Sequence, residues 1–313
     1  MKKICDFVAP QNKYTLFKLL YSGQLPLNPL WQKFSYRLKF ALRTFILAPK
    51  TITWLDHLAN YNLLGYFLSR QSNLPCKLQR PYLTTTFNSK ACLDALVFHY
   101  DFLSSKNPAL THALYGENPF LLATIIGKNE QKFNVVIHSE DKYSREGELT
   151  IYMFDDNGCQ LATLTFSLIK YEGKTTLFIA GLQGATGDDA KKRIQQATKS
   201  CFGIFPKRMV LEAALNFAKA LGFEQVVAVG NQSHIYNNWR YKSRFKQLHS
   251  DYDDFWLTLD AHKNQAGLFT IPLTIARKSI EDIASKKRSE YRNRYALLDN
   301  LEHDVQQHLL PLI

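Results

Sequence analysis

Four consecutive runs of β-forming residues constrain the fold of this chain more than any other feature. The runs are rich in β-branched and aromatic residues and occupy residues 133–140, 148–156, 159–173 and 174–184. Short polar links, DDNG and YEGK, separate the later runs as hairpin turns do. Because strands joined by such short links pair in opposite directions, the sequence predicts an antiparallel meander of about four strands.

Helices and strands alternate after the meander. One helix is expected over residues 188–202 and another over 206–222, where Pro206 stands at the first helical position and Gly222 at the end. The remaining expected elements are a buried strand at 224–232, a polar connection at 239–249, strands at 251–259 and 267–273, and a long helix from Arg277 to about Leu309. Residues 121–313 are therefore expected to form an α/β (α+β) domain with a mixed, mainly antiparallel sheet and flanking helices.

Residues 1–120 differ in character and are expected to form a helical, basic and aromatic N-terminal region. Apolar residues return every three or four positions between Lys13 and Ser104, as in amphipathic helices. The prolines that divide this stretch into short helices are Pro26, Pro29, Pro49, Pro75 and Pro81. The basic residues of one segment, residues 31–50, stand among aromatic ones, which suits either an anionic membrane surface or an ordinary solvated helix face.

The charge balance limits the partners. The chain has 39 Lys and Arg against 27 Asp and Glu, a net charge of +12, which favours an anionic membrane surface, a phosphorylated small molecule or nucleic acid. No helix-turn-helix, zinc-finger or RNA-binding signature accompanies the charge, so nucleic acid is the least favoured of the three.

The cysteines and the N-terminus indicate the compartment. The five cysteines are scattered, without Cys-x-x-Cys pairs or Cys/His metal spacing, as in a cytoplasmic protein with reduced thiols and no metal site. Asp6 and Pro10 interrupt the apolar core that a signal peptide needs, and no apolar run is long enough to span a membrane. We expect a cytoplasmic location, with peripheral contact at the inner membrane as the open alternative.

The order of elements resembles that of the acyl-CoA N-acyltransferase superfamily, with a long insertion after the fourth strand. The resemblance implies that the fourth and fifth strands diverge and that backbone amides beyond the fourth hold the pyrophosphate of an acyl donor. In the stretch FIAGLQGATGDD, Gly181, Gln183 and Gly184 would line such a cleft. A bulge and turn at a strand end would explain the same glycines, and the stretch lacks the pattern of a Walker or dinucleotide loop.

A second resemblance is carried by five spaced segments. These are GLQG at 181–184, FGIFPKRMVLEA at 202–213, AVGNQSH at 228–234, DYDDFW at 251–256 and SKKRSEYRNRYALL at 285–298. Together they are similar to the VirK/YbjX family of Gram-negative bacteria. The resemblance implies a cytoplasmic protein that supports envelope integrity, virulence and resistance to antimicrobial peptides, but it brings no established reaction and no catalytic residue.

Further candidate site residues follow from position and charge. Lys207 and Arg208 stand in the first turn of a helix, where cations are disfavoured and therefore hint at a bound anion. His234 follows a buried strand, and an imidazole can act as a general base near neutral pH, although a lone histidine is often structural. Asp254 can serve as an acid or base, or belong to a polar turn.

The last expected helix carries the densest basic patch. Lys287, Arg288 and Arg294 are expected to bind an anion, with an ordinary solvated helix face as the alternative. We expect the helix to pack back against the sheet and to bring this patch to the edge of the GLQG cleft.

Two functions follow from these observations. The first is a transferase that uses an acyl-CoA, acyl-carrier or aminoacyl donor, held by the glycine stretch with Lys207 and Arg208, while His234 or Asp254 takes the proton from the acceptor. The second is a non-catalytic peripheral membrane or partner-binding protein whose basic helices hold anionic lipid.

Overall fold

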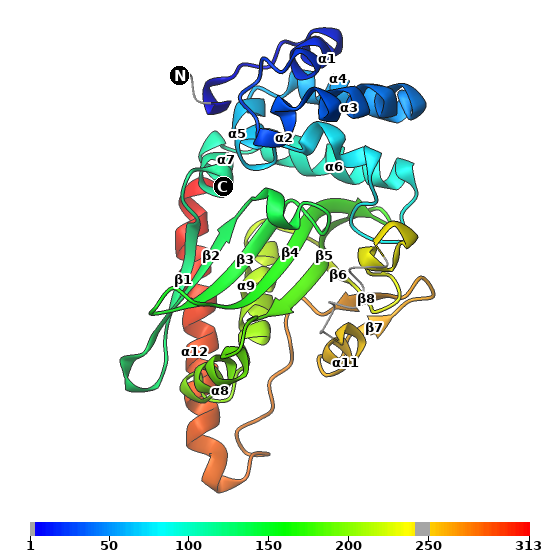
Figure 1. The fold of residues 1–313 in the computed structure, drawn as a ribbon. Helices are drawn as coiled ribbons and strands as arrows, with labels where there is room; N and C mark the ends of the chain where they lie inside the picture. The colour runs from blue at the N-terminus through cyan, green and yellow to red at the C-terminus, as the bar shows by residue number, and fades with distance from the viewer. Residues whose placement is uncertain (1–3, 242–250) are drawn as a thin grey trace.

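The computed structural model describes residues 4–241 and 251–313 of the chain, and Figure 1 shows its fold. Most of the polar connection expected at 239–249 lies outside the described residues. The helices before the sheet are α1 (Lys13–Ser22), α2 (Pro29–Gln32), α3 (Phe34–Ile46), α4 (Ala48–Asn60), α5 (Leu64–Arg70), α6 (Ser89–Ser104) and α7 (Pro108–Tyr115), with a 3-10 segment, η2, at Leu74–Gln79. This confirms a helical character for the N-terminal region.

The strands of the sheet are β1 (Phe120–Ile126), β2 (Lys132–His138), β3 (Leu149–Asp155), β4 (Gln160–Tyr171), β5 (Lys174–Gly184), β6 (Gln225–Val229), β7 (His262–Lys263) and β8 (Leu268–Ile271). Within the described ranges their order is β1-β2-β3-β4-β5-β6-β8-β7, and every neighbouring pair is antiparallel except β5 and β6. The predicted mixed α/β fold with a mainly antiparallel sheet is therefore confirmed, including the meander from β2 to β5.

The helices after the meander are α8 (Ala190–Ser200), α9 (Pro206–Ala220), α11 (Tyr252–Leu257) and α12 (Ser285–Leu309). The first two confirm the expected helices, and α12 begins later than the expected Arg277. The strand expected at 251–259 is wrong, because α11 occupies most of it. Asp251 caps this helix by accepting the backbone N–H of Asp254 at 3.2 Å, and the step of four from Tyr252 to Trp256 buries one helical face.

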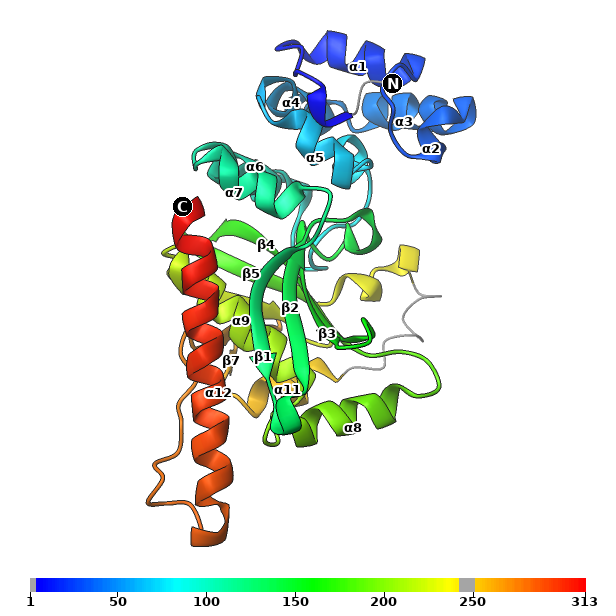
Figure 2. The same ribbon diagram turned by 90° about the vertical axis from the view of Figure 1, so that its left-hand side faces the viewer.

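Helices α9 and α12 lie together behind the sheet in Figure 1. α9 packs on β3, β4 and β5 through apolar side chains, and the rings of Phe166 and Phe217 are 5.6 Å apart. α12 runs beside β1 and α9 and buries Leu297, Leu298, Leu301, Val305 and Leu309. Figure 2 shows that its first half extends beyond the sheet.

Two open strand edges are covered by helices. β1 is an outer strand of the sheet. The α12 side chains of Asp304 and His308 bond to its backbone, to Thr124 N–H at 3.2 Å and to the carbonyl of Leu122 at 3.0 Å. β4 continues past the end of β3, and there α6 provides His99, whose Nδ1 accepts Leu168 N–H at 3.2 Å. These bonds satisfy backbone groups that an exposed edge would offer to another strand.

One cluster of buried apolar residues runs through both the helical layer and the sheet. The boundary expected between residues 120 and 121 falls at the first residue of β1, and the division into two regions stays an interpretation. No helix in the described ranges combines the length and apolar character that crossing a bilayer demands.

Candidate functional site

β5 and β6 pair in parallel over a short distance and then separate. The paired positions run from Thr176 opposite Gln225 to Ile179 opposite Ala228. Next on β5 is a bulge at Ala180, after which the strand continues to Gly184 paired with β4 and, within the described ranges, no longer with β6. Beyond the bulge, the N–H of Leu182 donates to the hydroxyl of Tyr252 at 3.1 Å, where a parallel neighbour strand would otherwise lie.

A buried polar cluster occupies the point where the two strands separate. Glu146 comes from the loop before β3, His234 from the segment after β6, Tyr252 from α11 and Gln183 from β5. His234 Nε2 lies 3.2 Å from Glu146 Oε1 and 3.4 Å from the Tyr252 hydroxyl. Glu146 and His234 are fully buried, and Gln183 Nε2 approaches the same carboxylate at 3.4 Å. Four segments distant in sequence therefore meet around one carboxylate.

The hydrogen bonds of His234 determine its role in this cluster. Its Nδ1 accepts the N–H of Tyr236 at 3.2 Å, so the proton of the neutral ring is on Nε2, facing Glu146. Both ring nitrogens are thus engaged. The carboxylate of Glu146 keeps acceptor capacity beyond the His234 bond, because the contacts from Gln183 are long, at 3.4 and 3.5 Å. Glu146 is the better-placed base, and His234 orients it.

Two glycines permit this placement of Glu146. A Cβ at Gly147 would lie 2.5 Å from the backbone oxygen of Phe166, so only glycine lets the loop cross β4 so closely. A Cβ at Gly181 would lie 2.9 Å from the carboxyl group of Glu146. The first glycine of GLQG therefore makes room for a buried acid.

The sheet surface beside Glu146 is polar and buried. Thr165 stands opposite Gly181 and Thr163 opposite Gln183 on β4, so these side chains share the face of Glu146. Thr150 on β3 continues the row, and its hydroxyl lies 3.0 Å from that of Thr165. All three threonines are buried, whereas the opposite sheet face is apolar under α9. The hydroxyls of Thr150 and Thr165 therefore satisfy each other, and the row gives this face of the sheet a polar character.

Tyr252 contributes a phenol to the same cluster. Burial raises its pKa well above the usual range, and the negative charge of Glu146 adds to the effect. The phenol therefore keeps its proton at neutral pH and is available as a donor.

The structure brings Lys207 beside the end of β5. A Cβ at Gly184 would be 3.6 Å from Lys207 Cε, and burial lowers the pKa of this lysine. Arg208 lies in the same first turn of α9 but forms an ion pair with Glu212 at 2.7 Å. Gly184 and Lys207 are thus adjacent, while the charge of Arg208 is compensated within its own helix.

Asp254 is exposed in the first turn of α11, and no described contact brings it to the buried cluster. The neighbouring Asp251 and Asp253 instead position the segment that contains Asn231. Asp253 accepts the N–H of Asn231 at 2.6 Å, and Asp251 accepts from the Asn231 amide at 2.8 Å. These bonds hold the segment that leads to His234 against the start of α11.

The basic residues of α12 are placed apart from one another. Lys287 is exposed, and Arg288 donates to the carbonyl oxygens of Ile283 and Glu281 at 2.9 and 3.1 Å. Arg294 donates to the carbonyl of Phe202, in the connection between α8 and α9, at 2.9 Å. The helix packs on the sheet as expected, but mainly through its second half, and no described contact joins these cations to Gly184.

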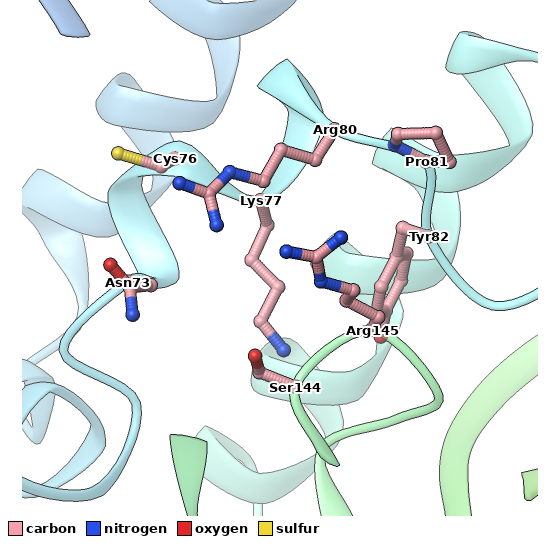
Figure 3. Close-up of a pocket in the computed structure, with 8 residues that line it drawn as sticks. All are labelled: Asn73, Cys76, Lys77, Arg80, Pro81, Tyr82, Ser144 and Arg145. Carbon is pink, nitrogen blue, oxygen red and sulfur yellow. The ribbon is translucent and has the colours of Figure 1, made fainter. Parts of the chain in front are cut away.

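A second buried cluster lies on the other side of the Glu146 loop. Glu148 accepts hydrogen bonds from Lys77 Nζ at 2.5 Å, from Tyr82 at 2.7 Å and from Tyr100. Figure 3 shows Lys77 with Arg80 and Arg145 around one pocket between η2 and this loop. The Arg145 guanidinium also stacks on Tyr241 at 4.3 Å. One short loop thus supplies both Glu146 and the carboxylate that links the sheet to the helical layer.

Sequence reasoning missed Glu146 as a site residue. It lies in the segment SREGEL, which has no motif, and only the close passage of Gly147 over β4 directs it to His234. Tyr252 stood inside the noted segment DYDDFW, where the aspartates drew attention instead. Tyr252 and Trp256 are four positions apart, the spacing of one helical face. This spacing is the signal that could have identified the helix and its buried face.

Comparisons with known proteins show a family match and several relatives. A family model described as "Protein of unknown function (DUF535)" matches residues 29–307. The chain is 40% identical over 289 residues to "Uncharacterized protein YbjX" of Escherichia coli (strain K12), covering 92% of this chain and 88% of the relative. A protein of Haemophilus influenzae is 29% identical over 232 residues, with 73% of each chain covered, and another is 34% identical over 166 residues, with about half of each chain covered (52% and 53%).

Proposed function

We propose that this chain, which belongs to the VirK/YbjX family (DUF535) of bacterial proteins, is an acyl- or aminoacyl-transferase that modifies a component of the cell envelope. The observation that carries the proposal is the buried Glu146–His234–Tyr252 cluster at the point where β5 and β6 separate. Separation of these two strands is also what the likeness to the acyl-CoA N-acyltransferases leads us to expect, whereas the bulge on β5 belongs to the alternative explanation of the glycines.

The cluster contains the groups that acyl transfer needs. The amine or hydroxyl of the acceptor attacks the carbonyl carbon of the donor, and Glu146 accepts the proton that the nucleophile loses. The bond from that carbon to the sulfur or oxygen of the donor breaks, and Tyr252 protonates the leaving group. His234 Nε2, within 3.4 Å of both groups, then donates its proton to Tyr252 and takes the proton from Glu146. This exchange returns all three residues to their starting states.

Binding of the donor is assigned to the end of β5. Gly181, Gln183 and Gly184 line the separated strand, and Lys207 supplies a cation for a phosphate or pyrophosphate group at the start of α9. Arg208 can assist only if it leaves Glu212. The donor is an acyl-CoA, an acyl-carrier protein or an aminoacyl ester, since these share a carbonyl attached to a good leaving group.

The proposed acceptor is a lipid or another envelope component on the cytoplasmic side. Its modification would support envelope integrity, virulence and survival of cationic antimicrobial peptides, as the family resemblance implies. A change in envelope charge or acylation alters how strongly a cationic peptide binds, which gives a physical link between the reaction and resistance.

The test uses the full chain and a deletion strain. Calorimetry should detect binding of an acyl-CoA, acyl-carrier or aminoacyl donor, and mass spectrometry should show altered lipid A or phospholipid in the deletion strain. Glu146→Gln should keep donor binding and lose roughly 100-fold or more of transfer, because only the base is removed. Asp254→Asn is the matched control and should retain activity.

Two results would count against the proposal. One is the absence of any donor binding together with unchanged lipid masses in the deletion strain. The other is full restoration of peptide survival by Glu146→Gln, which would favour the non-catalytic alternative. If Asp254→Asn loses transfer activity and Glu146→Gln does not, the general base is Asp254 and not Glu146.

A further inference from the structure

The inference begins with an apolar stripe on the exposed side of α3. Phe34, Leu38, Leu42 and Ile46 recur every four residues and so lie along one face, with Phe45 beside them. Their exposed fractions run from 39% at Leu38 to 78% at Ile46. Large apolar side chains in one contiguous row are unusual on a protein surface and mark a site of interaction.

This stripe is not the face that anchors the helix. α3 buries a different side, with Phe40, Ala41 and Thr44, and the ring of Phe40 packs 5.1 Å from that of Trp31. The helix therefore has one apolar face in the protein core and a second that stays largely exposed. On this second face the ring of Phe45 lies 6.3 Å from that of Phe17 and the ring of Phe34 lies 6.4 Å from that of Tyr21, yet Phe45 and Phe34 are both more than half exposed. Figures 1 and 2 show α3 at the end of the molecule farthest from α8 and α11.

The charge around the stripe has one sign. Residues 7–93 contain eleven Lys and Arg but a single acidic residue, Asp56, which pairs with Lys13 at 3.3 Å. Lys33, Lys39 and Arg43 lie on or beside α3 and are exposed, as is Lys50 in α4. A partner that covers the stripe must therefore be apolar within and anionic at its surface.

A groove continues the stripe at the end of α3. Its cavity has a volume of about 520 Å³ and is lined in part by Arg43, Ile46 and Leu47 from the α3 side. Arg80, Arg240 and Trp239 also line it, and Trp239 is 71% exposed. Arginines beside an exposed tryptophan suit the interface of a bilayer, where phosphate groups meet acyl chains.

We propose that the α3 stripe and the adjoining arginine groove form a surface that docks on an anionic lipid bilayer. An amphipathic helix with cations along its apolar face is the pattern of a protein that lies in the plane of the membrane surface. A second copy of the chain fits poorly, because a two-fold contact would place the cationic stretch against itself. Nucleic acid would leave the apolar row unused. The inference goes beyond the proposed reaction, since it concerns binding alone.

The experiment is flotation of the purified full chain with vesicles of phosphatidylethanolamine and phosphatidylglycerol, compared with vesicles of phosphatidylcholine alone. The chain should float with the anionic vesicles only, and added salt should weaken the binding. Lys39→Gln/Arg43→Gln/Lys50→Gln should lower affinity roughly 100-fold, because each cation near an anionic surface contributes somewhat less than tenfold. Leu42→Gln/Phe45→Gln/Ile46→Gln should lose at least as much.

Matched controls change the same chemistry elsewhere. Lys191→Gln/Lys192→Gln/Lys199→Gln removes three exposed cations from α8, and Phe205→Gln/Leu310→Gln removes exposed apolar side chains. Both controls should float like the unmodified chain. Thermal unfolding of every variant checks that each one is folded.

Several outcomes would overturn the proposal. If the α3 variants float like the unmodified chain, the surface is not used. If the α8 control loses as much affinity as the α3 charge variant, the attraction is only that of net charge. If the unmodified chain does not float and sediments as a dimer that the α3 apolar variant abolishes, the occupant is a second copy.

Discussion

Gly181 and Gly184 lie three residues apart on β5 but have different surroundings. A Cβ at Gly181 would meet the buried carboxyl group of Glu146 at 2.9 Å, whereas one at Gly184 would make ordinary contacts at 3.5 and 3.6 Å. Gly181→Ala should therefore destabilise the fold by about 1–3 kcal/mol through overpacking, and Gly184→Ala should have little effect. Urea denaturation of the two variants measures this difference. Equal stability of both would show that the Glu146 loop moves away without cost.

His99 should give the protein a pH-dependent stability. Burial lowers its pKa from 6.5 to about 4, while its Nδ1 accepts Leu168 N–H and its Nε2 lies 2.9 Å from the Tyr115 hydroxyl. The unfolded chain takes up a proton near pH 6.5, but the folded chain resists until about pH 4. Stability from this group is thus complete above pH 6.5 and falls as the pH drops towards 4, by about 3 kcal/mol.

The measurement compares the unmodified chain with His99→Gln across that pH window. The free energy of unfolding should fall more steeply with acid in the unmodified chain, because glutamine cannot take up the proton. Burial also lowers the pKa of His138, but this residue is present in both proteins and its contribution cancels. Parallel curves for the two proteins would contradict a role for His99.

At the scale of elements, one buried ion pair joins η2 to the start of β3. Lys77 and Glu148 have side-chain exposures of 3% and 0%, and Tyr82 and Tyr100 complete the bonds of the carboxylate. Lys77→Met leaves a buried carboxylate without its cation, so we expect a loss of about 3–5 kcal/mol. Lys77→Met/Glu148→Gln should recover part of it, because no charge is then buried alone.

Lys90 and Asp94 provide the control for that pair. They form an exposed ion pair within α6 at 2.6 Å, and Lys90→Gln should cost no more than about 0.5 kcal/mol. The denaturation midpoints of Lys77→Met, Lys77→Met/Glu148→Gln and Lys90→Gln measure these losses of stability. If Lys77→Met costs as little as Lys90→Gln, the buried cluster does not hold the helical layer to the sheet.

The elements that sequence predicts well are those whose signal is local. β2 to β5 follow from alternating and β-branched runs with hairpin links, and α9 follows from a proline start and a glycine stop. α11 was expected as a strand because Tyr252, Phe255 and Trp256 favour strands, while its helical signal is one capping aspartate and a step of four. Short elements leave too few residues for periodicity to decide.

The candidate site was predictable only in part, for a related reason. The end of β5 and the segment of His234 were expected, because strand ends and glycines have local signatures. Glu146 was not, since its place depends on a loop that crosses β4 and on a glycine two strands away. The aspartates of DYDDFW show the opposite case, in which residues that stand out in the sequence are not part of the site. Asp251 and Asp253 bond to Asn231 rather than face the cluster.

For the whole molecule, the contact of α12 with β1 joins the end of the chain to the first strand. Leu301 is buried in this contact, and Leu310, just beyond the helix, is 62% exposed. Leu301→Ala should lower the free energy of unfolding by about 2–5 kcal/mol, because a cavity remains between helix and sheet. Leu310→Ala should change it very little. Chemical denaturation of both variants tests this, and similar values would show that α12 adds no stability to the sheet.

The bonds from Asp304 and His308 to the backbone of β1 also have a consequence for co-translational folding. The strand is made before the other seven, but the helix that covers its open edge is translated only after all of them. Until then a nascent chain can expose a strand edge that pairs with a neighbour on the same polysome. Slow translation of the segment before α12 should therefore lower the soluble yield, and a holding chaperone should restore it.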